Sequence, residues 1–257
     1  MLNIIKTALQ SNSHKISVVS NNIANAGTTA FKRSEAIFED FYLQAEREGL
    51  ALGSGAKVQS NRVSHNPAQL KKTGVSSDLA VNGHGMFMVA NPEATDQVSF
   101  TRNGSFQLDE NGFLTTNDGQ LVLSRTLDPI LVPFEKNGLP LSEFNVNPEG
   151  YVMTAYGVGS AEPGEQLGMA YFNNPGALAQ MGNGRFLATD DAALSGVYAP
   201  GSNGTGRVLS GHLEVANVDL VHELVSLINT QQAFSAASKD RKSTRLNSSH
   251  LVISYAV

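Results

Sequence analysis

The sequence predicts an α+β fold, in which N- and C-terminal helices pair as a coiled coil and a central all-β domain of hairpins occupies the middle of the chain. Two observations support this prediction. Apolar residues follow heptad spacing at both ends, and short apolar runs alternate with turn dipeptides between them. The chain has 257 residues, enough to bury a substantial core, and this length allows one large domain or two small ones.

Residues 1–31 are predicted to form an N-terminal helix. Apolar or small residues recur there in steps of three and four, and only Asn12 is polar in that register. A stripe this narrow needs a partner, because isolated helices are marginally stable. Gly27 and the threonines after it indicate the end of the helix. The predicted seam comprises Leu2, Ile5, Leu9, Ile16 and Val19, and it continues through Ile23 and Ala26.

Residues 32–75 are predicted to form an extended connector. The first part, EAIFEDFYLQAERE, could be helical. The second part, GLALGSGAKVQSNRVSHNPAQLKKTG, is polar and interrupted by Gly and Pro, which favours an extended chain. We therefore expect a domain boundary near residue 75.

Residues 76–211 are predicted to form a β-rich body. Runs such as LAV, MFMV, FLTT and YVM are separated by NG, DG, EG and PG dipeptides, which are typical of hairpin turns. FQLDENGFLTT at Phe106–Thr116 also aligns with FNVNPEGYVMT at Phe144–Thr154. We interpret the two segments as similar hairpins that turn at Gly112 and Gly150, since two copies are too few for a solenoid.

Residues 212–240 are predicted to form a C-terminal helix with a broad apolar face. Asp219 and Glu223 lie in its opening turns, where carboxylates suit the helix dipole. Each end helix needs a partner, so the simplest arrangement pairs the two helices and leaves an outer face for neighbouring copies. The predicted seam residues are Val221, Leu224, Val225 and Ile228.

Residues 241–257 are predicted to be a non-native tail. The string DRKSTRLNSSHLVISYAV, which follows Lys239, has no heptad and contains several Ser and Asn residues that disfavour a helix interior. It resembles translated sequencing-adapter read-through. A divergent natural tail is the alternative.

The composition disfavours several classes of function. Lys and Arg total 18 against 23 Asp and Glu, a formal net charge of −5, which disfavours binding to nucleic acid. The chain has no cysteine, which excludes disulfides, thiolate catalysis and Cys-ligated metal sites. The N-terminus lacks the apolar core of a secretory signal peptide, and no apolar run has the length of a membrane-spanning helix. We therefore expect no integral membrane segment.

The sequence also lacks the motifs of catalytic and cofactor sites. No histidine falls in H-E-x-x-H or H-x-H spacing, and no G-x-S-x-G occurs. Gly83-His84-Gly85 is only a fragment of a dinucleotide fingerprint, and the turns at Asp109 and Asn117 lack the ligand pattern of an EF-hand. We predict no enzyme, no cofactor, and no catalytic or metal-binding residue, although scattered Asp and Glu residues leave a catalytic carboxylate pair open.

The segment VVSNNIANAGTTAFKRSEAIFED at Val18–Asp40 closely resembles the N-terminal signature of flagellar basal-body rod and hook proteins. In that signature an S-x-N-[IL]-A-N core precedes a threonine-containing turn and G-F-K, and Ala30 stands here in place of the Gly. Segments beginning at Ser76, Phe100 and Leu209 resemble later parts of the family in the same order, through residue 239. The matching signature residues, which we predict to be an assembly motif, are Ser20, Asn21, Asn22, Ile23, Ala24, Asn25, Thr28, Phe31 and Lys32.

The resemblance implies a structural subunit of the basal-body rod in the periplasm. Such subunits polymerise through their terminal helices, which form an inner assembly domain, into a hollow axial tube that transmits torque and carries exported subunits. The implied partners are other copies of the chain, neighbouring rod and hook subunits, and the flagellar export apparatus. Nucleic acid and cofactors are not implied.

The length of the chain favours a rod subunit, because hook subunits usually carry an extra β domain. A subunit of the distal rod is preferred, and a proximal rod or hook subunit is the alternative. A secreted β-rich binding module is a further alternative, but the absence of Trp and the presence of only 6 Tyr give it little support.

Particular roles follow for the predicted motif. Asn21, Asn22 and Asn25 are expected to form hydrogen bonds across the helix end, and Ile23 is expected to continue the seam. Phe31 together with Lys32 is expected to anchor the chain as it leaves the helix. Alternatively, the asparagines only terminate the helix.

Overall fold

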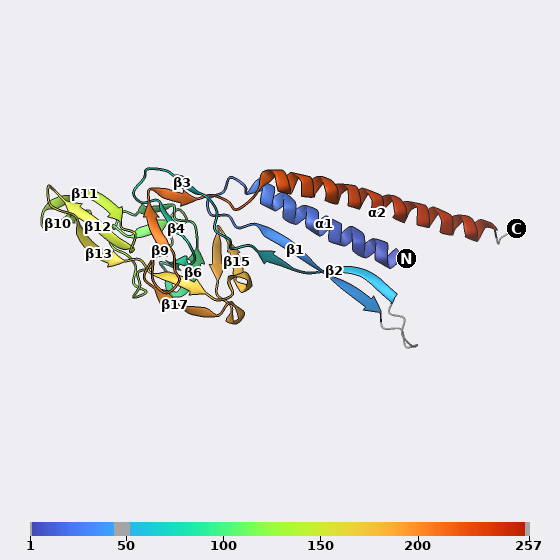
Figure 1. Cartoon of the computed structure of the whole chain (residues 1–257), viewed down its shortest axis with the longest axis horizontal. Coiled ribbons are helices and arrows are strands. Elements are labelled where there is room, and N and C mark those ends of the chain that lie inside the picture. The colour runs from blue at the N-terminus through green and yellow to red at the C-terminus, as the bar shows by residue number, and fades with distance from the viewer. Residues whose placement is uncertain (1, 44–51, 255–257) are drawn as a thin grey trace. The chain divides into compact units, whose positions relative to one another are not determined.

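The structure, a computed structural model, describes residues 2–43 and 52–254, which divide into two compact units (Figure 1). The terminal unit consists of the described parts of Met1–Ala26, Arg33–Ser64 and Val218–Val257. The β unit consists of Gly27–Lys32 and His65–Asn217.

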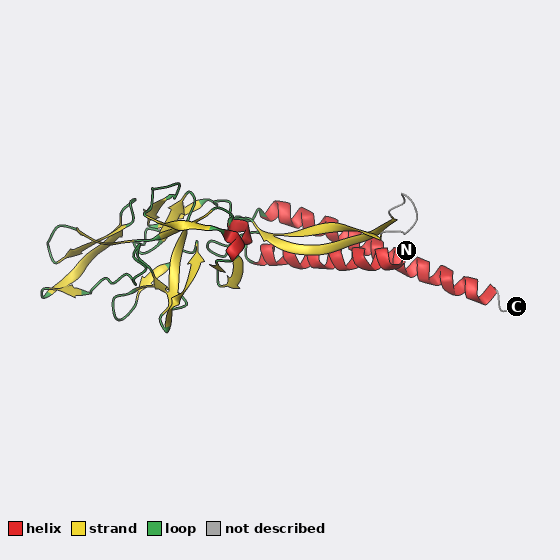
Figure 2. Cartoon of the chain, turned by 90° about the horizontal axis from the view of Figure 1, so that it is seen from below, coloured by secondary structure: helices red, strands yellow, loops and turns green. Residues whose placement is uncertain are grey.

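The terminal unit contains two long helices and one hairpin, which lie side by side (Figures 1 and 2). The helices are α1, Leu2–Ala24, and α2, Leu220–Ser254. The hairpin is formed by β1, Ser34–Leu43, and β2, Leu52–Val63, which pair antiparallel.

One face of α1 packs against this hairpin. Ser11, Val18, Val19 and Asn22 are buried, and their spacing places them on one side of the helix. The Ser11 hydroxyl donates a hydrogen bond of 3.2 Å to the carbonyl of Ala56 in β2. The partner that α1 requires is therefore supplied in part by a β-hairpin.

The predicted fold class needs correction, because the structure does not show the two helices paired as a coiled coil. Between residues 220 and 243 of α2, the buried side chains are polar, Glu223 at 0% and Thr230 at 4% exposure. The predicted seam residues of α2 are among the exposed large apolar side chains, with Val221 72% exposed. Heptad spacing alone does not determine which face of a helix becomes buried, and here polar partners for Glu223 orient α2.

The region from residue 32 to 75 is also different from the prediction. Residues 34–43, which were expected to be connector or helix, form β1, and much of the remainder forms β2 and β3. Part of EAIFEDFYLQAERE lies outside the described residues. Glu35 and Glu39 lie on the same face of β1 and are exposed, which suits a strand with one face toward solvent.

The β unit contains a sheet of nine strands, a sheet of four strands and two smaller pairs. In the largest sheet the order is β15-β16-β6-β5-β9-β8-β7, and β14 pairs with both β5 and β17. The four-stranded sheet has the order β10-β11-β12-β13, and the pairs are β18-β4 and β19-β3. The strands are β3 Leu70–Lys72, β4 Leu79–Asn82, β5 Met86–Asn91, β6 Ala94–Thr101, β7 Phe106–Leu108, β8 Leu114–Thr116, β9 Leu121–Val122, β10 Glu135–Lys136, β11 Leu139–Val146, β12 Tyr151–Tyr156, β13 Glu162–Gln166, β14 Met169–Phe172, β15 Ala179–Gly182, β16 Arg185–Leu187, β17 Leu194–Tyr198, β18 Arg207–Ser210 and β19 His212–Glu214. Two short 3-10 helices are η1 Pro175–Ala177 and η2 Asp190–Ala192.

The core of the β unit is apolar and draws on strands that are far apart in the chain. Phe87 and Phe106 meet edge to face with ring centroids 5.2 Å apart. Leu79, Leu114 and Leu167 are fully buried in the same cluster.

The two hairpins predicted from the internal repeat are confirmed. Phe106 pairs with Thr116 and Phe144 pairs with Thr154, in antiparallel register. Gly112 and Gly150 both have φ of 85°, a conformation that glycine adopts without steric cost. An added Cβ at Gly112 would lie 2.4 Å from the carbonyl oxygen of Val132, so the close approach also requires glycine.

The boundaries of both terminal helices differ from those predicted. α1 ends at Ala24 rather than near residue 31, and a series of turns follows. Residues 212–214 form β19, so α2 begins at Leu220. α2 then continues to Ser254, well into the predicted tail. Among the described residues, no helix has the length and apolar character needed to cross a membrane.

Candidate assembly site

The residues of the predicted assembly motif lie at the end of α1 and in the turns after it. They belong to both units, because Ser20–Asn25 fall in the terminal unit and Thr28–Lys32 in the β unit. The structure therefore gives these residues different surroundings.

Asn22 connects three elements of the terminal unit. Its side chain is 1% exposed, and its amide nitrogen donates to the Ser34 carbonyl at 2.8 Å. The Ser34 N–H donates back to the Asn22 amide oxygen at 3.0 Å. The same amide nitrogen lies 3.3 Å from Oε2 of Glu223 in α2. Because an amide side chain offers donors and an acceptor together, Asn22 can satisfy the β1 backbone and the Glu223 carboxylate at once.

Glu223 is the second polar group buried in the terminal unit. It is 0% exposed and accepts an ion-paired hydrogen bond from Nε of Arg33, just before β1. Asp219 precedes α2 and caps its N-terminal end, since the Asp219 carboxylate accepts hydrogen bonds from the N–H groups of Val221 at 2.9 Å and His222 at 3.2 Å. α2 is thus fixed at its first turn by Asp219 and Glu223.

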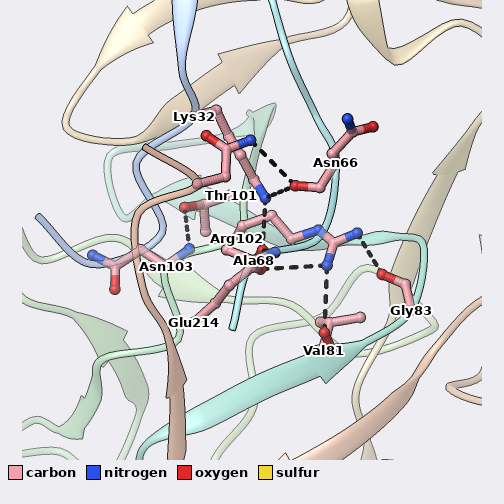
Figure 3. Close-up of polar contacts among 10 residues, drawn as sticks. Lys32, Asn66, Ala68, Val81, Gly83, Thr101, Arg102, Asn103 and Glu214 are labelled. Carbon is pink, nitrogen blue, oxygen red and sulfur yellow. Dashed lines mark hydrogen bonds and ion pairs between the residues drawn. The ribbon is translucent and has the colours of Figure 1, made fainter. Parts of the chain in front are cut away.

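Lys32 lies in a buried ion cluster of the β unit (Figure 3). Its Nζ is 2.6 Å from Oε1 of Glu214 and donates to the Asn66 carbonyl at 2.9 Å. Arg102 contacts the other carboxylate oxygen of Glu214 at 3.4 Å, and the Ala68 N–H donates to Oε1 at 2.8 Å. Burial lowers the pKa of Lys32 from its ordinary value, and the Glu214 carboxylate opposes that change.

The remaining motif residues are more accessible. Asn25 donates from its side chain to the carbonyl of Asn21 at 2.9 Å, which is a hydrogen bond across the helix end. Ile23 and Phe31 are half-buried. The exposed members of the motif are Ser20, Asn21, Ala24 and Thr28.

The predicted seams contribute differently to packing. In α1, Val19 is buried, whereas Ile5, Leu9 and Ile16 are half-buried. Leu2 begins the helix. In α2, a stripe of large apolar side chains is exposed, with exposed fractions of 48% for Leu220 and Leu224, 72% for Val221, and 52% for Val225 and Ile228. We call these five residues the α2 stripe.

The α2 stripe is the clearest candidate contact surface of the terminal unit. Adjacent exposed apolar side chains on one helix face are typical of interaction sites, because soluble proteins seldom leave such patches uncovered. Within the described residues, no group of three or more His, Cys, Asp or Glu side chains could hold a metal ion. The α2 stripe is therefore suited to packing against another apolar surface.

Sequence reasoning did not identify the partners of the buried motif residues. Glu214 and Arg102 are distant from Lys32 in the chain, and Glu223 was interpreted only as a favourable charge at a helix start. One signal was present: Glu214 stands within the apolar segment HLEV, where a carboxylate requires a cation if it is buried.

Three family profiles match successive parts of the chain. Residues 2–32 match the profile described as "Flagella basal body rod protein", and residues 80–157 match "Flagellar hook protein FlgE/F/G D1 domain". Residues 209–239 match "Flagellar basal body rod FlgEFG protein C-terminal". Together the profiles include α1, part of the β unit and the beginning of α2.

Several characterised proteins are similar over most of the chain. The flagellar basal-body rod protein FlgG of Buchnera aphidicola subsp. Acyrthosiphon pisum is 35% identical over 251 residues, with 92% of each chain covered. FlgG of Bacillus subtilis is 31% identical over 238 residues, covering 88% of this chain and 87% of its own length. The flagellar hook protein FlgE of Caulobacter vibrioides is 27% identical over 254 residues, covering 94% of this chain but 42% of its own length.

Proposed function

Because the chain belongs to the family of flagellar basal-body rod and hook proteins, we propose that it is a structural subunit of the basal-body rod. Proteins of this family are structural, and the chain is not an enzyme. Its location is the flagellar basal body, and its partners include other rod and hook subunits.

The coverage of the relatives supports a rod subunit over a hook subunit. The chain accounts for 92% of a rod relative's length but only 42% of the hook relative's length. The rod relatives carry the name FlgG, the distal rod protein, so the distal rod is the preferred position. A proximal rod or hook subunit remains the alternative.

We propose further that copies of the chain polymerise through the terminal unit into the hollow axial tube that transmits torque. The single observation that supports this step best is the α2 stripe, whose five large apolar side chains are exposed in the isolated chain. Burying them between copies would remove apolar surface from water, at about 25 cal/mol for each Å². In this proposal Asn22 fixes the C-terminal end of α1 and Lys32 anchors the turns that belong to the β unit. The exposed Ser20, Asn21 and Ala24 face neighbouring subunits.

Two further parts of the proposal rest on the family and on the sequence. The chain would leave the cell through the flagellar export apparatus, as the family's subunits do. Residues 241–257 would be a non-native tail, and the C-terminal profile, which matches only to residue 239, supports this.

Complementation tests the proposed function directly. In a strain that lacks its own distal rod subunit, the chain carrying a FlgG C-terminus in place of residues 241–257 is expected to restore rods, hooks and swimming. Val225→Asp places a charge in the α2 stripe and should abolish all three, while the purified variant keeps its fold because Val225 is exposed. The matched control is Ala233→Asp, at an exposed position of the same helix that is turned away from the stripe, which should still support swimming.

Failure of every version to restore rods would contradict the rod assignment. Full swimming with Val225→Asp would contradict assembly through the α2 stripe.

A further inference from the structure

The chain passes between the two units four times, after residues 26, 32, 64 and 217. Three segments of the β unit therefore lead directly into the terminal unit, and we call residues 27–32, 65–69 and 214–217 the first, second and third entry segments. The first segment is joined to the terminal unit at both ends, and each of the others at one end. Any force that reaches the β unit along the chain passes through these segments.

Backbone hydrogen bonds connect the entry segments to one another. The Ala30 N–H donates to the carbonyl of Glu214 at 2.8 Å, which joins the first segment to the third. The Val215 N–H donates to the carbonyl of Gln69 at 3.0 Å, which joins the third segment to the second. Neutral hydrogen bonds contribute little net stability one by one, because the same groups bond to water in the unfolded chain. These bonds alone do not make the three segments depend strongly on one another.

Three further polar contacts close a triangle among the same segments (Figure 3). Nζ of Lys32, in the first segment, lies 2.6 Å from Oε1 of Glu214 in the third. Lys32 also donates to the carbonyl of Asn66, in the second segment, at 2.9 Å. The Ala68 N–H, also in the second segment, donates to Oε1 of Glu214 at 2.8 Å. Every pair of entry segments therefore shares one of these contacts.

Arg102 joins this triangle to the body of the β unit. Its Nη1 is 3.4 Å from Oε2 of Glu214, and its Nη2 donates to the carbonyl of Gly83 at 2.8 Å. Arg102 directly follows β6, a strand of the largest sheet. The carboxylate of Glu214 thus connects the entry segments to that sheet.

The charged side chains of this cluster are buried, which makes their contacts depend on one another. Lys32, Arg102 and Glu214 are 2%, 3% and 1% exposed. Removing one partner of a buried ion pair is strongly unfavourable, because the remaining charge stays desolvated and loses its counter-charge. If the first segment moves away, Glu214 loses Lys32, and if the third moves away, both cations lose Glu214. Separation of one segment therefore weakens the attachment of the others.

We propose that Lys32 and Glu214 form a clamp that makes the three entry segments separate from the β unit only together. Force that arrives along one crossing of the chain is then shared among all four, since no segment is peeled off by itself. This load-sharing role rests on the proposed function, because a rod subunit that transmits torque experiences such force. The clamp itself belongs to a single chain and exists before assembly.

Hydrogen exchange of the purified monomer tests the clamp without assembly. The N–H groups of Ala30, Ala68 and Val215 report on the first, second and third segments, and NMR follows their exchange in a series of low urea concentrations. A single opening unit gives the three N–H groups one opening free energy and one dependence on urea. Opening free energies that differ and stay separate as urea rises would overturn the clamp.

Lys32→Met weakens the clamp from one segment only, since it keeps the apolar stem, removes the charge and leaves Glu214 with its other cation. We expect protection to fall about tenfold or more at all three reporter N–H groups. The Leu123 N–H, inside the β unit, should keep its protection. The matched control is Lys136→Met, which removes an exposed ion pair with Glu162 and should change none of these groups. A loss confined to the first segment would overturn the clamp, and if Lys32→Met does not fold, the urea series of the wild-type chain decides alone.

Swimming under load tests the load-sharing role. Both variants are placed in the chain that carries a FlgG C-terminus and are expressed in the strain that lacks its own distal rod subunit. We expect both to form rods and hooks and to swim alike in dilute medium, and Lys32→Met to slow more steeply than Lys136→Met as methylcellulose raises the viscosity. Equal slowing of the two variants, or rods with Lys136→Met but none with Lys32→Met, would overturn load sharing. Absence of rods from every version, the unsubstituted chain included, contradicts the proposed function instead, and the exchange result then decides the clamp.

Discussion

Ala30 has a backbone conformation that is unusual for its side chain. It has φ of 55° in the left-handed region, it is 1% exposed, and its N–H donates to the Glu214 carbonyl at 2.8 Å. The left-handed conformation costs a residue with a Cβ about 1 kcal/mol relative to glycine. The family usually has Gly at this position, so the structure explains the preference.

A glycine at this position should therefore be tolerated although the site is buried. We expect Ala30→Gly to leave the free energy of unfolding unchanged or to raise it by up to about 1 kcal/mol. Ala80→Gly, in β4, is the matched control: Ala80 is 0% exposed and has no positive φ, so its variant should lose about 1 kcal/mol. Urea unfolding of the two variants checks this. An equal loss in both would show that the backbone of Ala30 is not strained.

His65 makes the stability of the β unit depend on pH. Burial, together with the positive charges of Lys32 and Arg102, lowers the pKa of His65 to about 4. The unfolded chain, with an ordinary pKa near 6.5, then binds the proton more readily than the folded chain between these values. The contribution of the neutral His65 side chain to the stability of the fold is therefore fully present above about pH 6.5, and it is lost as the pH falls towards 4.

Substitution of His65 should remove this dependence. The free energy of unfolding of the wild-type chain should fall by roughly 2 kcal/mol between pH 6.5 and 4 because of this group. The decrease should be smaller by that amount in His65→Phe and unchanged in His222→Phe, the matched control at an exposed position of α2. Parallel pH profiles for the wild type and His65→Phe would contradict the assignment.

At the scale of elements, Asn22 decides how α1, β1 and α2 are joined. Replacement of its amide leaves the N–H and carbonyl of Ser34 without the hydrogen bonds of 3.0 and 2.8 Å. Unsatisfied buried backbone groups are costly, at about 1 to 3 kcal/mol. Asn21, its neighbour, is exposed.

We therefore expect Asn22→Ala to lower the free energy of unfolding by about 2 kcal/mol and to speed amide hydrogen exchange in β1. Asn21→Ala, the matched control, should change stability little. If Asn22→Ala is fully stable yet abolishes rods, Asn22 acts in contacts between copies and not within the chain.

The sequence predicted the β hairpins well and the helix packing poorly, for physical reasons. Gly112 and Gly150 specify their turns locally, through a positive φ that neighbouring residues do not need to supply. The orientation of α2 depends instead on Glu223 meeting Asn22 and Arg33, which are distant in sequence. A heptad pattern indicates that an apolar face requires a partner, but it does not identify that partner.

The candidate assembly site could likewise be predicted only in part from the sequence. The signature from Ser20 to Lys32 could be identified by resemblance, but its separation into buried and exposed members could not. Lys32 finds Glu214 and Arg102 only once β6 and β19 are placed near it in the β unit. Long-range ion pairs of this kind have no periodicity from which they could be predicted.

At the scale of the whole molecule, we assign separate roles to the two units. The terminal unit carries the α2 stripe and so an uncovered apolar face, whereas the β unit has its own core and its own buried ion cluster. Assembly through the first unit requires no change in the second.

The most direct test of this account is the accessibility of the α2 stripe before and after assembly. The chain has no cysteine, so Val225→Cys introduces a single thiol for maleimide labelling. Glu110→Cys, at an exposed turn of the β unit, shows how a thiol outside the stripe reacts in the same samples. If copies assemble through the α2 stripe, Val225→Cys is labelled in the monomer and protected in isolated rods; equal labelling of Val225→Cys in both would contradict assembly through the stripe.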